Sequence, residues 1–547
     1  MKLGMGQRMR AAWVMVCALG FLGSGWAQEA WWAPSAWQAS ASDQVRSSIR
    51  SDDEGLCLDA DFGGVSGFAV MRREWPVQWP EAFDLELKVK GQGAVNDIQF
   101  KFVDASGDNV WWVHRPRMKW SPGWHTWRLK RRHVQFAWGP TTDPHLRQTR
   151  FMEVVVAAGQ EGGRTSVCVA SWRLAPREAD PAIWPTPQRQ QDTEQLTLDW
   201  GVPREFNGLE LRWPQSPTGT QGVVPRNYDV QLSDDGQQWQ TVREVRGATQ
   251  PVQALFLPER ESRWMRLLRR SEGGTASLGW PDVQLRSAME WPDVNAVIAA
   301  QARLLSRGEL PRAFLGEQNY WTLVGVDGAG SRSALMSEDG AVELGRLGPS
   351  VEPVVRVEGD SGGLVTWADV KLSHHLPEGY VPQPVVRWTH PNLVLDIQTG
   401  ADGAPERSQA LVRYTLRNPS TRQQTYTLAW VVRPWQVNPP QQFLNTPGGV
   451  RPITSLAWSE HALWVDGHAL LHPTAASRPS AAPGMATRVS ALPYDAGLGL
   501  QALLDAPPLH TLQDPQAMAS AVLQQRVTLA PGAQMTWGWW APLTPES

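Results

Sequence analysis

Several acidic side chains of this sequence have a spacing from which a pair of carboxyl groups could be built. Glu317, Glu338 and Asp339 flank predicted hairpins. Two carboxyl groups about 5 to 10 Å apart across a cleft can hydrolyse a glycosidic bond. Acidic residues at hairpin turns are more often ordinary solvated side chains. No catalytic residue is therefore predicted.

A serine between glycines is the second chemically suggestive feature. Residues 359–363 read GDSGG, the order found around the nucleophile of chymotrypsin-like serine proteases. Such a serine needs a histidine base and an acid that orients the histidine. The upstream histidines His114, His125 and His133 belong to a different predicted domain. Ser361 is therefore expected in a loop between two strands.

Indole side chains are unusually frequent, with 31 Trp against 12 Phe and 6 Tyr. An indole offers a flat apolar face and one N–H donor, which suits a β-sandwich core and also a surface on which a sugar ring stacks. Trp111 and Trp112 are adjacent in a predicted strand, so they must point to opposite faces and only one can enter the core of its own sheet. We expect the other indole on a surface that stacks a pyranose, unless a neighbouring domain covers it. The candidate residues for this surface are Lys101, Trp111, Trp112, Arg115 and Trp138.

A second candidate set for sugar contacts lies in residues 433–449, which read RPWQVNPPQQFLNTPGG. The run is polar, aromatic and rich in turn residues, so it is too irregular for a strand, and loops of this kind often bind ligands. A rigid crossover held by its prolines is an equal alternative. The candidate residues are Trp435, Asn438, Phe443 and Asn445.

Metal and cofactor motifs are weak or missing in the sequence. Asp52, Asp53, Glu54, Asp59 and Asp61 could hold a structural Ca²⁺ through their oxygens, but they lack the ordered spacing of a known loop. A solvated turn is the favoured interpretation. The sequence has no Walker loop, HExxH, CxxC pair or dinucleotide fingerprint, so no metal and no cofactor are predicted.

Charge and the N-terminus indicate where the protein acts. The formal net charge of -3 gives no broad basic field, which argues against nucleic acid as the main partner. Lys2, Arg8 and Arg10 precede an apolar run at 11–22, and Ala27 ends a small-residue cleavage site. This pattern predicts a signal peptide at 1–27 and a periplasmic or extracellular protein. No other apolar stretch is long enough to span a bilayer.

Two cysteines remain after the predicted signal, Cys57 and Cys168. They lie near the two ends of one predicted domain of an exported protein, so a disulfide is favoured over two buried thiols. Closing a loop of about 110 residues would stabilise the fold by roughly 4 to 5 kcal/mol in the chain-entropy model.

Short strands alternate with turn residues along the whole mature chain. In residues 97–104 (DIQFKFVD), Ile98, Phe100 and Phe102 share one face of a strand, and Gln99 and Lys101 share the other. Residues 312–345 interleave β-formers with the pairs at 327–328 and 339–340, both Asp-Gly, which predicts antiparallel hairpins.

One helix is predicted between the sheet domains. Asp293 can cap its N-terminus, apolar residues follow at helical spacing, and Gly308 can end it. Its apolar stripe is expected to dock on the domain that follows.

Residues 198–201 (LDWG), 228–230 (YDV), 233–236 (SDDG) and 264–267 (WMRL), with Trp239, resemble the discoidin or coagulation-factor C-type family. The opening strands and ligand-contacting loops of that family are short here, since residues 180–184 stand where a longer portion would be. The resemblance therefore implies a packing role for this domain more than independent ligand binding.

The first sandwich resembles a jelly-roll carbohydrate-binding module. The whole arrangement resembles large secreted bacterial proteins that pair a discoidin-like module with a six-hairpin glycosidase. In those proteins a large antiparallel sandwich precedes an (α/α) barrel that holds the catalytic carboxylates. Here the sequence ends at a strand containing Trp539 and Trp540, and no helical barrel follows.

The expected fold is all-β, with tandem β-sandwiches and one linker helix. The predicted divisions are a signal peptide at 1–27, a jelly-roll-like sandwich at 47–176, a discoidin-like sandwich at 177–288, the linker helix at 289–310 and a large antiparallel sandwich at 311–547.

The resemblance implies a secreted protein that binds polysaccharide as the non-catalytic part of a glycoside-hydrolase system. A separately encoded glycosidase barrel is an expected partner. Two alternatives stay open: a glycoside hydrolase with its site in the third domain or completed by a partner barrel, and an adhesion or scaffold protein.

Overall fold

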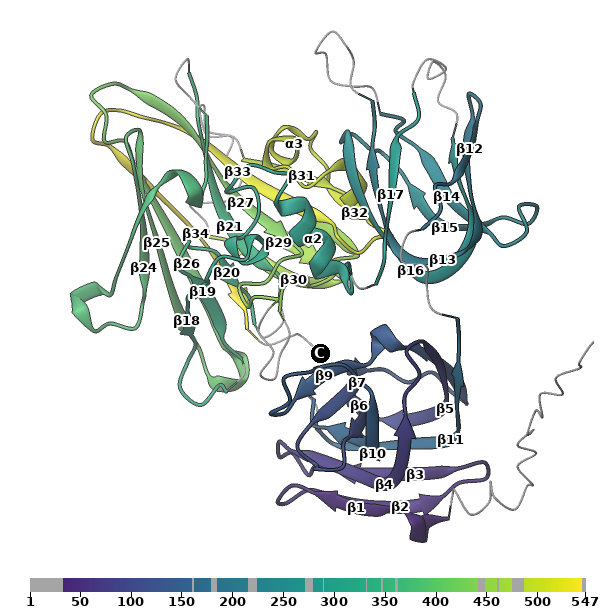
Figure 1. Cartoon of the computed structure of the whole chain (residues 1–547). Helices are drawn as coiled ribbons and strands as arrows, with labels where there is room; N and C mark the ends of the chain where they lie inside the picture. Colours follow the sequence, from purple (N-terminus) through teal and green to yellow (C-terminus); the bar gives the residue numbers. More distant parts are fainter. Residues whose placement is uncertain are drawn as a thin grey trace, which may run out of the picture. The chain divides into compact units, whose positions relative to one another are not determined.

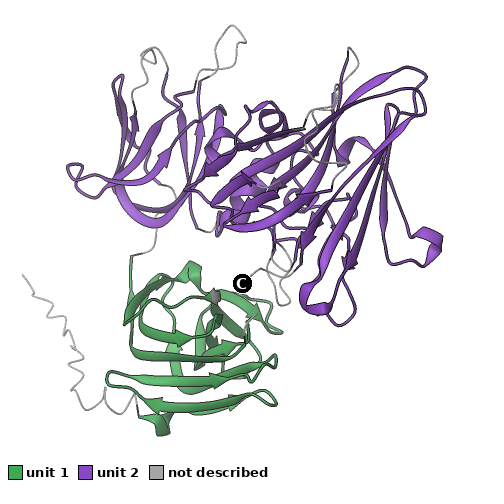
Figure 2. Ribbon diagram, turned by 180° about the vertical axis from the view of Figure 1, so that it is seen from behind, with its two compact units in different colours: residues 1–183 green, residues 184–547 purple. Residues whose placement is uncertain are grey.

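The computed structural model describes residues 33–159, 162–178, 184–214, 224–270, 279–288, 290–330, 332–345, 348–359, 363–440, 448–459, 462–474 and 487–543. The chain forms two compact units, residues 1–183 and 184–547, which are described separately (Figure 2). Both are built from antiparallel sheets, so the predicted all-β fold is confirmed. The predicted signal peptide lies outside the described residues.

Unit 1 is a sandwich of two antiparallel sheets, ordered β1-β4-β10-β6-β7-β9 and β2-β3-β11-β5-β8 (Figure 1). Ile98, Phe100 and Phe102 of β6 are fully buried between the sheets, as their alternation predicts. The strands are β1 (Gln38–Ala41), β2 (Arg46–Ser51), β3 (Leu56–Asp61), β4 (Phe68–Gln78), β5 (Phe83–Gly93), β6 (Asn96–Val103), β7 (Val110–Met118), β8 (His125–Lys130), β9 (Gln135–Trp138), β10 (Gln148–Ala157) and β11 (Arg164–Pro176).

The predicted disulfide is confirmed. Cys57 of β3 and Cys168 of β11 are direct cross-strand partners and form a bond that closes a separation of 111 residues. Both cysteines are buried on the face of the second sheet that points away from the core. The alternative of two free thiols is wrong.

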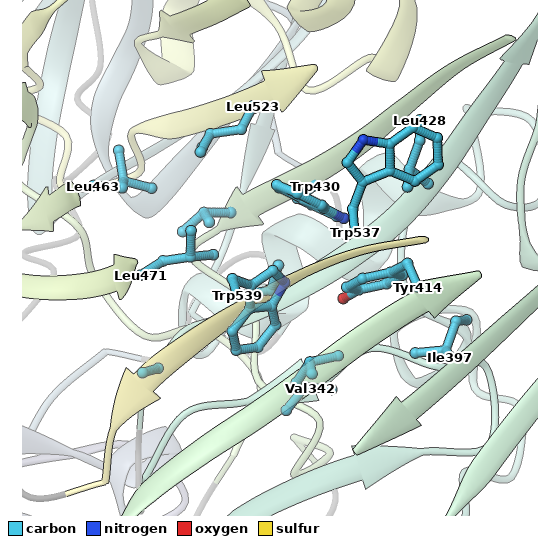
Figure 3. Close-up of a cluster of buried hydrophobic side chains, with 14 of the residues drawn as sticks. Val342, Ile397, Tyr414, Leu428, Trp430, Leu463, Leu471, Leu523, Trp537 and Trp539 are labelled. Carbon is cyan, nitrogen blue, oxygen red and sulfur yellow. The ribbon is translucent and has the colours of Figure 1, made fainter. Parts of the chain in front are cut away.

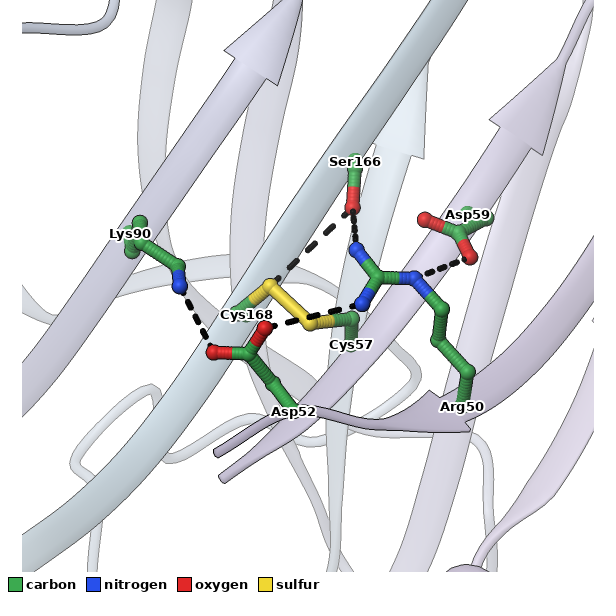
Figure 4. The surroundings of a disulfide bond; sticks show 7 residues. All are labelled: Arg50, Asp52, Cys57, Asp59, Lys90, Ser166 and Cys168. Atoms are coloured by element: carbon green, nitrogen blue, oxygen red, sulfur yellow. Dashed lines mark hydrogen bonds and ion pairs between the residues drawn. A yellow bond between two sulfur atoms is a disulfide. The ribbon is translucent and has the colours of Figure 1, made fainter. Parts of the chain in front are cut away.

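Ion pairs surround the disulfide and account for the acidic cluster (Figure 4). Asp52 lies 2.6 Å from Lys90, and Arg50 donates to Asp59 at 2.8 Å. The hydrogen bond from Lys90 holds the pKa of Asp52 below its usual value. Two further acids have cationic partners as well, Glu54 with Lys88 and Asp61 with Arg164. Protein cations therefore pair with four of the five carboxylates of this cluster.

Unit 2 begins with one six-stranded sheet that folds over into two layers. β13 and β16 are 18 residues long, and their pairing is interrupted between Asp199 and Arg204. The first half of β13 pairs with β12 and the second half with β17, so the two long strands bend from one layer into the other (Figure 1). The strands are β12 (Gln188–Gln191), β13 (Gln195–Arg212), β14 (Tyr228–Ser233), β15 (Gln240–Val245), β16 (Val252–Arg269) and β17 (Asp282–Arg286).

The linker helix α2 (Val294–Ala302) is shorter than predicted. The Asp293 side chain accepts a hydrogen bond from the backbone N–H of Ala296 at 3.0 Å, which confirms the N-cap. The helix stops at Ala302, and Gly308 does not end it. Instead Gly308 has φ +99° beside the Thr366 side chain, where a β-carbon would collide. Packing of the following segment against the large sandwich therefore sets the end of the helix.

Buried residues of α2 contact both sides of unit 2. Val297 packs with Ala254 of β16, and Ile298 packs with Phe314 and Trp435 of the following sandwich. The predicted docking of this helix on the next domain is confirmed.

The rest of unit 2 is a large sandwich of an eight-stranded and a nine-stranded antiparallel sheet. Gly340 has φ +89° in the tight turn between β19 and β20, as the Asp-Gly pair predicts. Tyr414 packs beside Trp430 and Trp539 in the core (Figure 3), and the centroid of its ring lies 5.7 Å from that of Trp430 and 6.4 Å from that of Trp539. The divisions predicted within unit 2 stay a prediction.

The elements of this sandwich are β18 (Trp321–Val324), β19 (Ala334–Ser337), β20 (Val342–Glu343), β21 (Ser350–Val357), β22 (Gly363–Val365), β23 (Lys371–His375), β24 (Val385–His390), β25 (Leu393–Asp402), β26 (Gln409–Arg417), β27 (Gln424–Arg433), β28 (Ser455–Ser459), β29 (Ala462–Val465), β30 (His468–Pro473), β31 (Thr487–Leu492), α3 (Leu500–Asp505), β32 (Thr511–Gln513), β33 (Ser520–Leu529) and β34 (Gln534–Pro542).

Candidate functional site

Pairing between β6 and β7 decides which of the two adjacent indoles is available. Phe102 opposes Trp111, and Lys101 opposes Trp112. Trp111 shares the core face with Phe102, and its side chain donates an N–H to the backbone oxygen of Pro144 at 2.6 Å. The predicted opposite orientations are confirmed. Trp111 is therefore the core indole, and Trp112 is the surface indole of the pair.

Trp112 lies on the outer face of the first sheet, next to two other rings. Its ring meets that of Trp138 edge to face, with centroids 5.6 Å apart and an interplanar angle of 84°. It also stacks on His114, with ring centroids 4.8 Å apart and an interplanar angle of 28°. Trp138 in β9 is 46% exposed. We call Trp112, His114 and Trp138 the aromatic corner.

Charged side chains border the aromatic corner. The Lys101 ammonium lies 4.9 Å from the centroid of the Trp138 ring. The strand register places Glu153 of β10 beside Lys101 on one side and beside Arg72 of β4 on the other. The Arg72 guanidinium lies 3.5 Å from the Glu153 carboxylate. His114 and Asp97 approach at 3.2 Å. Flat rings together with donors and acceptors at their edges are the chemistry that a sugar ring and its hydroxyl groups require.

Four buried valines lie beneath the side chains of this surface. Val70, Val103, Val110 and Val155 are buried, yet they lie outside the core between the two sheets. Burial also lowers the pKa of Lys101, and the Glu153 carboxylate opposes that shift. The aromatic corner and Lys101 therefore lie over buried apolar side chains that exclude part of the water. Hydrogen bonds and charge interactions are stronger there than in bulk water.

Arg115 does not join the aromatic corner. It opposes Ile98, a core residue, so it projects from the same side of β7 as Trp111. Its guanidinium lies 5.7 Å from the ring of Trp127 in β8 of the second sheet. Arg115 is exposed, and the strand alternation places it on the face of β7 opposite Trp112.

The second predicted set is buried where the structure describes it. Trp435 is fully buried and meets Phe314 edge to face at 5.4 Å. Asn438 is 8% exposed, and its backbone N–H donates to Glu343 at 2.9 Å. Trp435 and Asn438 are therefore packed inside unit 2, as the crossover alternative expects for the described residues of this run. Phe443 and Asn445 lie outside the described residues.

The acidic residues considered for hydrolysis gather around arginines. Arg312 donates to Asp339 at 2.7 Å and lies 3.5 Å from Glu338, and Arg307 donates to Glu317 at 2.9 Å. Burial raises the pKa of Asp339, and the hydrogen bond from Arg312 opposes that shift. The hollow beside Arg312 and Asp339 has a volume of about 30 Å³, room for a water molecule and not for a sugar ring.

The serine between glycines lies mostly outside the described residues, which exclude 360–362. Val357 ends β21 and Gly363 begins β22, and the predicted loop position of Ser361 lies outside the described residues.

Sequence reasoning missed the polar residues that complete the outer face. Alternation along β7 places His114 on the same face as Trp112, so that residue could have been found. Asp97, Arg72 and Glu153 come from three other strands, and only the strand register brings them to this face.

Two other hollows contain none of the predicted sugar-contacting residues. One, of about 570 Å³, lies on unit 1 beside Arg46, Asp61 and Arg164. The other, of about 260 Å³, lies within unit 2 beside α2, with Leu304 and Tyr494 in its wall. In the part of the chain that the structure covers, no helix has the length and apolarity needed to cross a bilayer.

Sheet topology thus defines an all-β protein of tandem sandwiches, and comparison with known families identifies one of them. Residues 174–280 match the F5/8 type C domain, which confirms the discoidin-like segment. No curated protein sequence matches the chain.

Solved structures show distant likenesses to carbohydrate-binding and glycoside-hydrolase modules. The family 11 carbohydrate-binding module of the cellulase Lic26A-Cel5E of Clostridium thermocellum matches with 12% identity over 26% of this chain and 88% of its own, with a TM-score of 0.22. A family 4 carbohydrate-binding module matches with 13% identity over 26% and 97%, with a TM-score of 0.19. A glycoside hydrolase family 29 member from a rumen bacterium matches with 12% identity over 45% and 41%, with a TM-score of 0.16. These scores are too low to carry an argument about function.

Proposed function

We propose that this protein binds polysaccharide through the aromatic corner of unit 1. The observation that carries the proposal is the perpendicular pair of Trp112 and Trp138, with Trp138 46% exposed and Lys101 beside it. An indole face excludes water from one side of a sugar ring, while neighbouring charged and amide groups exchange hydrogen bonds with its hydroxyl groups.

We further propose that the protein acts outside the cytoplasm as the non-catalytic part of a glycoside-hydrolase system. The disulfide supports an oxidising compartment, and the charged, apolar and small-residue order of residues 1–27 supports export. The arginine pairing of Glu317 and Asp339 supports a structural role for the acids of unit 2. A separately encoded glycosidase barrel is the proposed partner, and the discoidin-like domain is proposed to act in packing.

The test is affinity electrophoresis of the full chain in gels that contain soluble polysaccharides. Retention of the wild-type protein is expected, with a loss of about tenfold in affinity for Trp112→Ala and Trp138→Ala. Trp124→Ala is the matched control, because Trp124 is a partly exposed indole beside Lys88 and Lys90 of the second sheet. Thermal unfolding of each variant checks that the fold is intact.

Three outcomes would overturn the proposal. Undiminished retention of folded Trp112→Ala and Trp138→Ala variants would move the binding surface elsewhere. Release of reducing ends by the purified chain alone would make it an enzyme. Saturable protein binding with no polysaccharide retention would instead favour an adhesion or scaffold role.

A further inference from the structure

On the outer face of the first sheet of unit 1, the described carboxylates pair with cations other than Lys101. Glu153 pairs with Arg72 at 3.5 Å, Glu74 pairs with Arg150 at 2.9 Å, and Asp97 approaches His114 at 3.2 Å. Lys101 lies in the middle of this face, and no described carboxylate forms an ion pair with it. The Glu153 carboxylate interacts with it electrostatically, but Glu153 already forms an ion pair with Arg72.

The position of Lys101 raises the free energy of its ammonium group when no anion is paired with it. Its ammonium lies over the Trp138 ring and its strand neighbour is Trp112, so two indoles replace part of its water shell. A partly dehydrated cation is destabilised until an anion approaches it. The attraction between the ammonium and the indole face offsets only part of that cost.

Geometry places this ammonium where a bound sugar would carry its substituents. A pyranose that stacks on an indole keeps its ring parallel to that indole, so its substituents project from the ring edge toward neighbouring side chains. Lys101 is such a neighbour for both Trp112 and Trp138. A carboxylate or a sulfate ester at the sugar edge would meet the ammonium, whereas a hydroxyl would leave its charge unbalanced.

We propose that the aromatic corner selects acidic polysaccharides, with a sugar carboxylate or sulfate paired to Lys101. This inference rests on the proposed function and names the chemical class of its ligand.

Matched polymers that differ only in charge test it. The pairs are polygalacturonate against its fully methyl-esterified form, carboxymethylcellulose against hydroxyethylcellulose, and dextran sulfate against dextran. We expect the full chain to bind the acidic member of at least one pair about fivefold to tenfold more tightly, as one partly buried ion pair provides. The first two pairs report a carboxylate and the third a sulfate. The preference should shrink as salt is raised, because salt screens a partly exposed pair.

Lys101→Gln should abolish the preference, so that the affinities for the acidic and the neutral member of a pair become equal within about twofold. Lys119→Gln, at an exposed lysine after β7, should keep the preference and so controls for net charge. Equal binding of acidic and neutral polymers by the wild-type chain, or a preference that survives Lys101→Gln, would overturn this inference and leave the proposed function standing. Failure to bind any member of any pair would overturn both.

Discussion

Arg243 and Asp495 lie 252 residues apart in the sequence and form an ion pair at 2.5 Å, with side chains only 4% and 7% exposed. Arg243 belongs to β15 of the discoidin-like sheet, and Asp495 precedes α3 of the large sandwich. The second oxygen of Asp495 accepts the backbone N–H of Arg246 at 3.0 Å. This pair therefore ties the two parts of unit 2 together, which supports a packing role for the discoidin-like sheet.

Asp495→Asn should destabilise unit 2 by about 3 to 5 kcal/mol, because it leaves the Arg243 guanidinium buried without its counter-charge. Urea unfolding followed by tryptophan fluorescence measures the loss. The control is Asp505→Asn, since Asp505 is 53% exposed in its pair with Arg356 and should cost less than about 1 kcal/mol. The double change Arg243→Met with Asp495→Leu should recover stability relative to the single variant. Equal losses for Asp495→Asn and Asp505→Asn would contradict this account.

Asp199 should give unit 2 a dependence on acid pH. Two hydrogen bonds from Arg263, at 2.7 and 2.8 Å, hold the pKa of Asp199 below its usual value. A carboxyl group with a lowered folded-state pKa stabilises the fold above its unfolded pKa, and that contribution is lost as pH falls through the folded value. Because Arg263 is 40% exposed, we expect a contribution of no more than about 1 kcal/mol.

The measurement is chemical unfolding of the wild type and of Asp199→Asn between pH 7 and pH 2. The wild type should be more stable at pH 7, and the two curves should converge as the pH falls. Asp234→Asn, at a neighbouring exposed turn, should follow the wild type throughout. A gap between wild type and Asp199→Asn that stays constant with pH would show that lost packing, and not charge, explains the difference.

Reduction of the disulfide should destabilise unit 1 and spare unit 2. The bond between Cys57 and Cys168 closes a loop of 111 residues, for which the chain-entropy model gives about 4 to 5 kcal/mol. Calorimetry with and without reductant should show that the unfolding transition of unit 1 moves to lower temperature on reduction. The transition of unit 2 should stay in place. The Cys57→Ser, Cys168→Ser double variant should match the reduced protein and should not respond to reductant. A shift of the double variant on reduction would contradict the assignment.

The sequence predicted what depends on local pattern. Residue alternation separated Trp111 from Trp112, an Asp-Gly pair placed the turn at Gly340, and Asp293 was recognised as a helix cap. Each of these follows from a few neighbouring residues, so no knowledge of distant contacts was needed.

What depends on tertiary contacts could not be predicted. Trp435 lies in a polar, proline-rich run, and it is buried only because Phe314 and Ile298 pack on it from elsewhere in the chain. The linker helix ends early because the segment that follows packs beside Thr366. The ion pair of Arg72 with Glu153 requires the register of β4 and β10, which local periodicity does not fix.

Adjacent substitutions at Trp111 and Trp112 should separate stability from binding. Trp111 fills the core of unit 1 beside Phe136, at 5.5 Å, so Trp111→Ala should cost about 3 to 5 kcal/mol of unfolding free energy. Trp112 contacts only the outer face, so Trp112→Ala should cost less than about 2 kcal/mol and yet lose polysaccharide retention. Trp111→Phe, which keeps a core ring, should bind normally. Urea unfolding and affinity electrophoresis on the same samples measure both quantities. If Trp112→Ala were the less stable variant, or if Trp111→Phe lost binding while folded, the assignment of the two faces of β7 would be reversed.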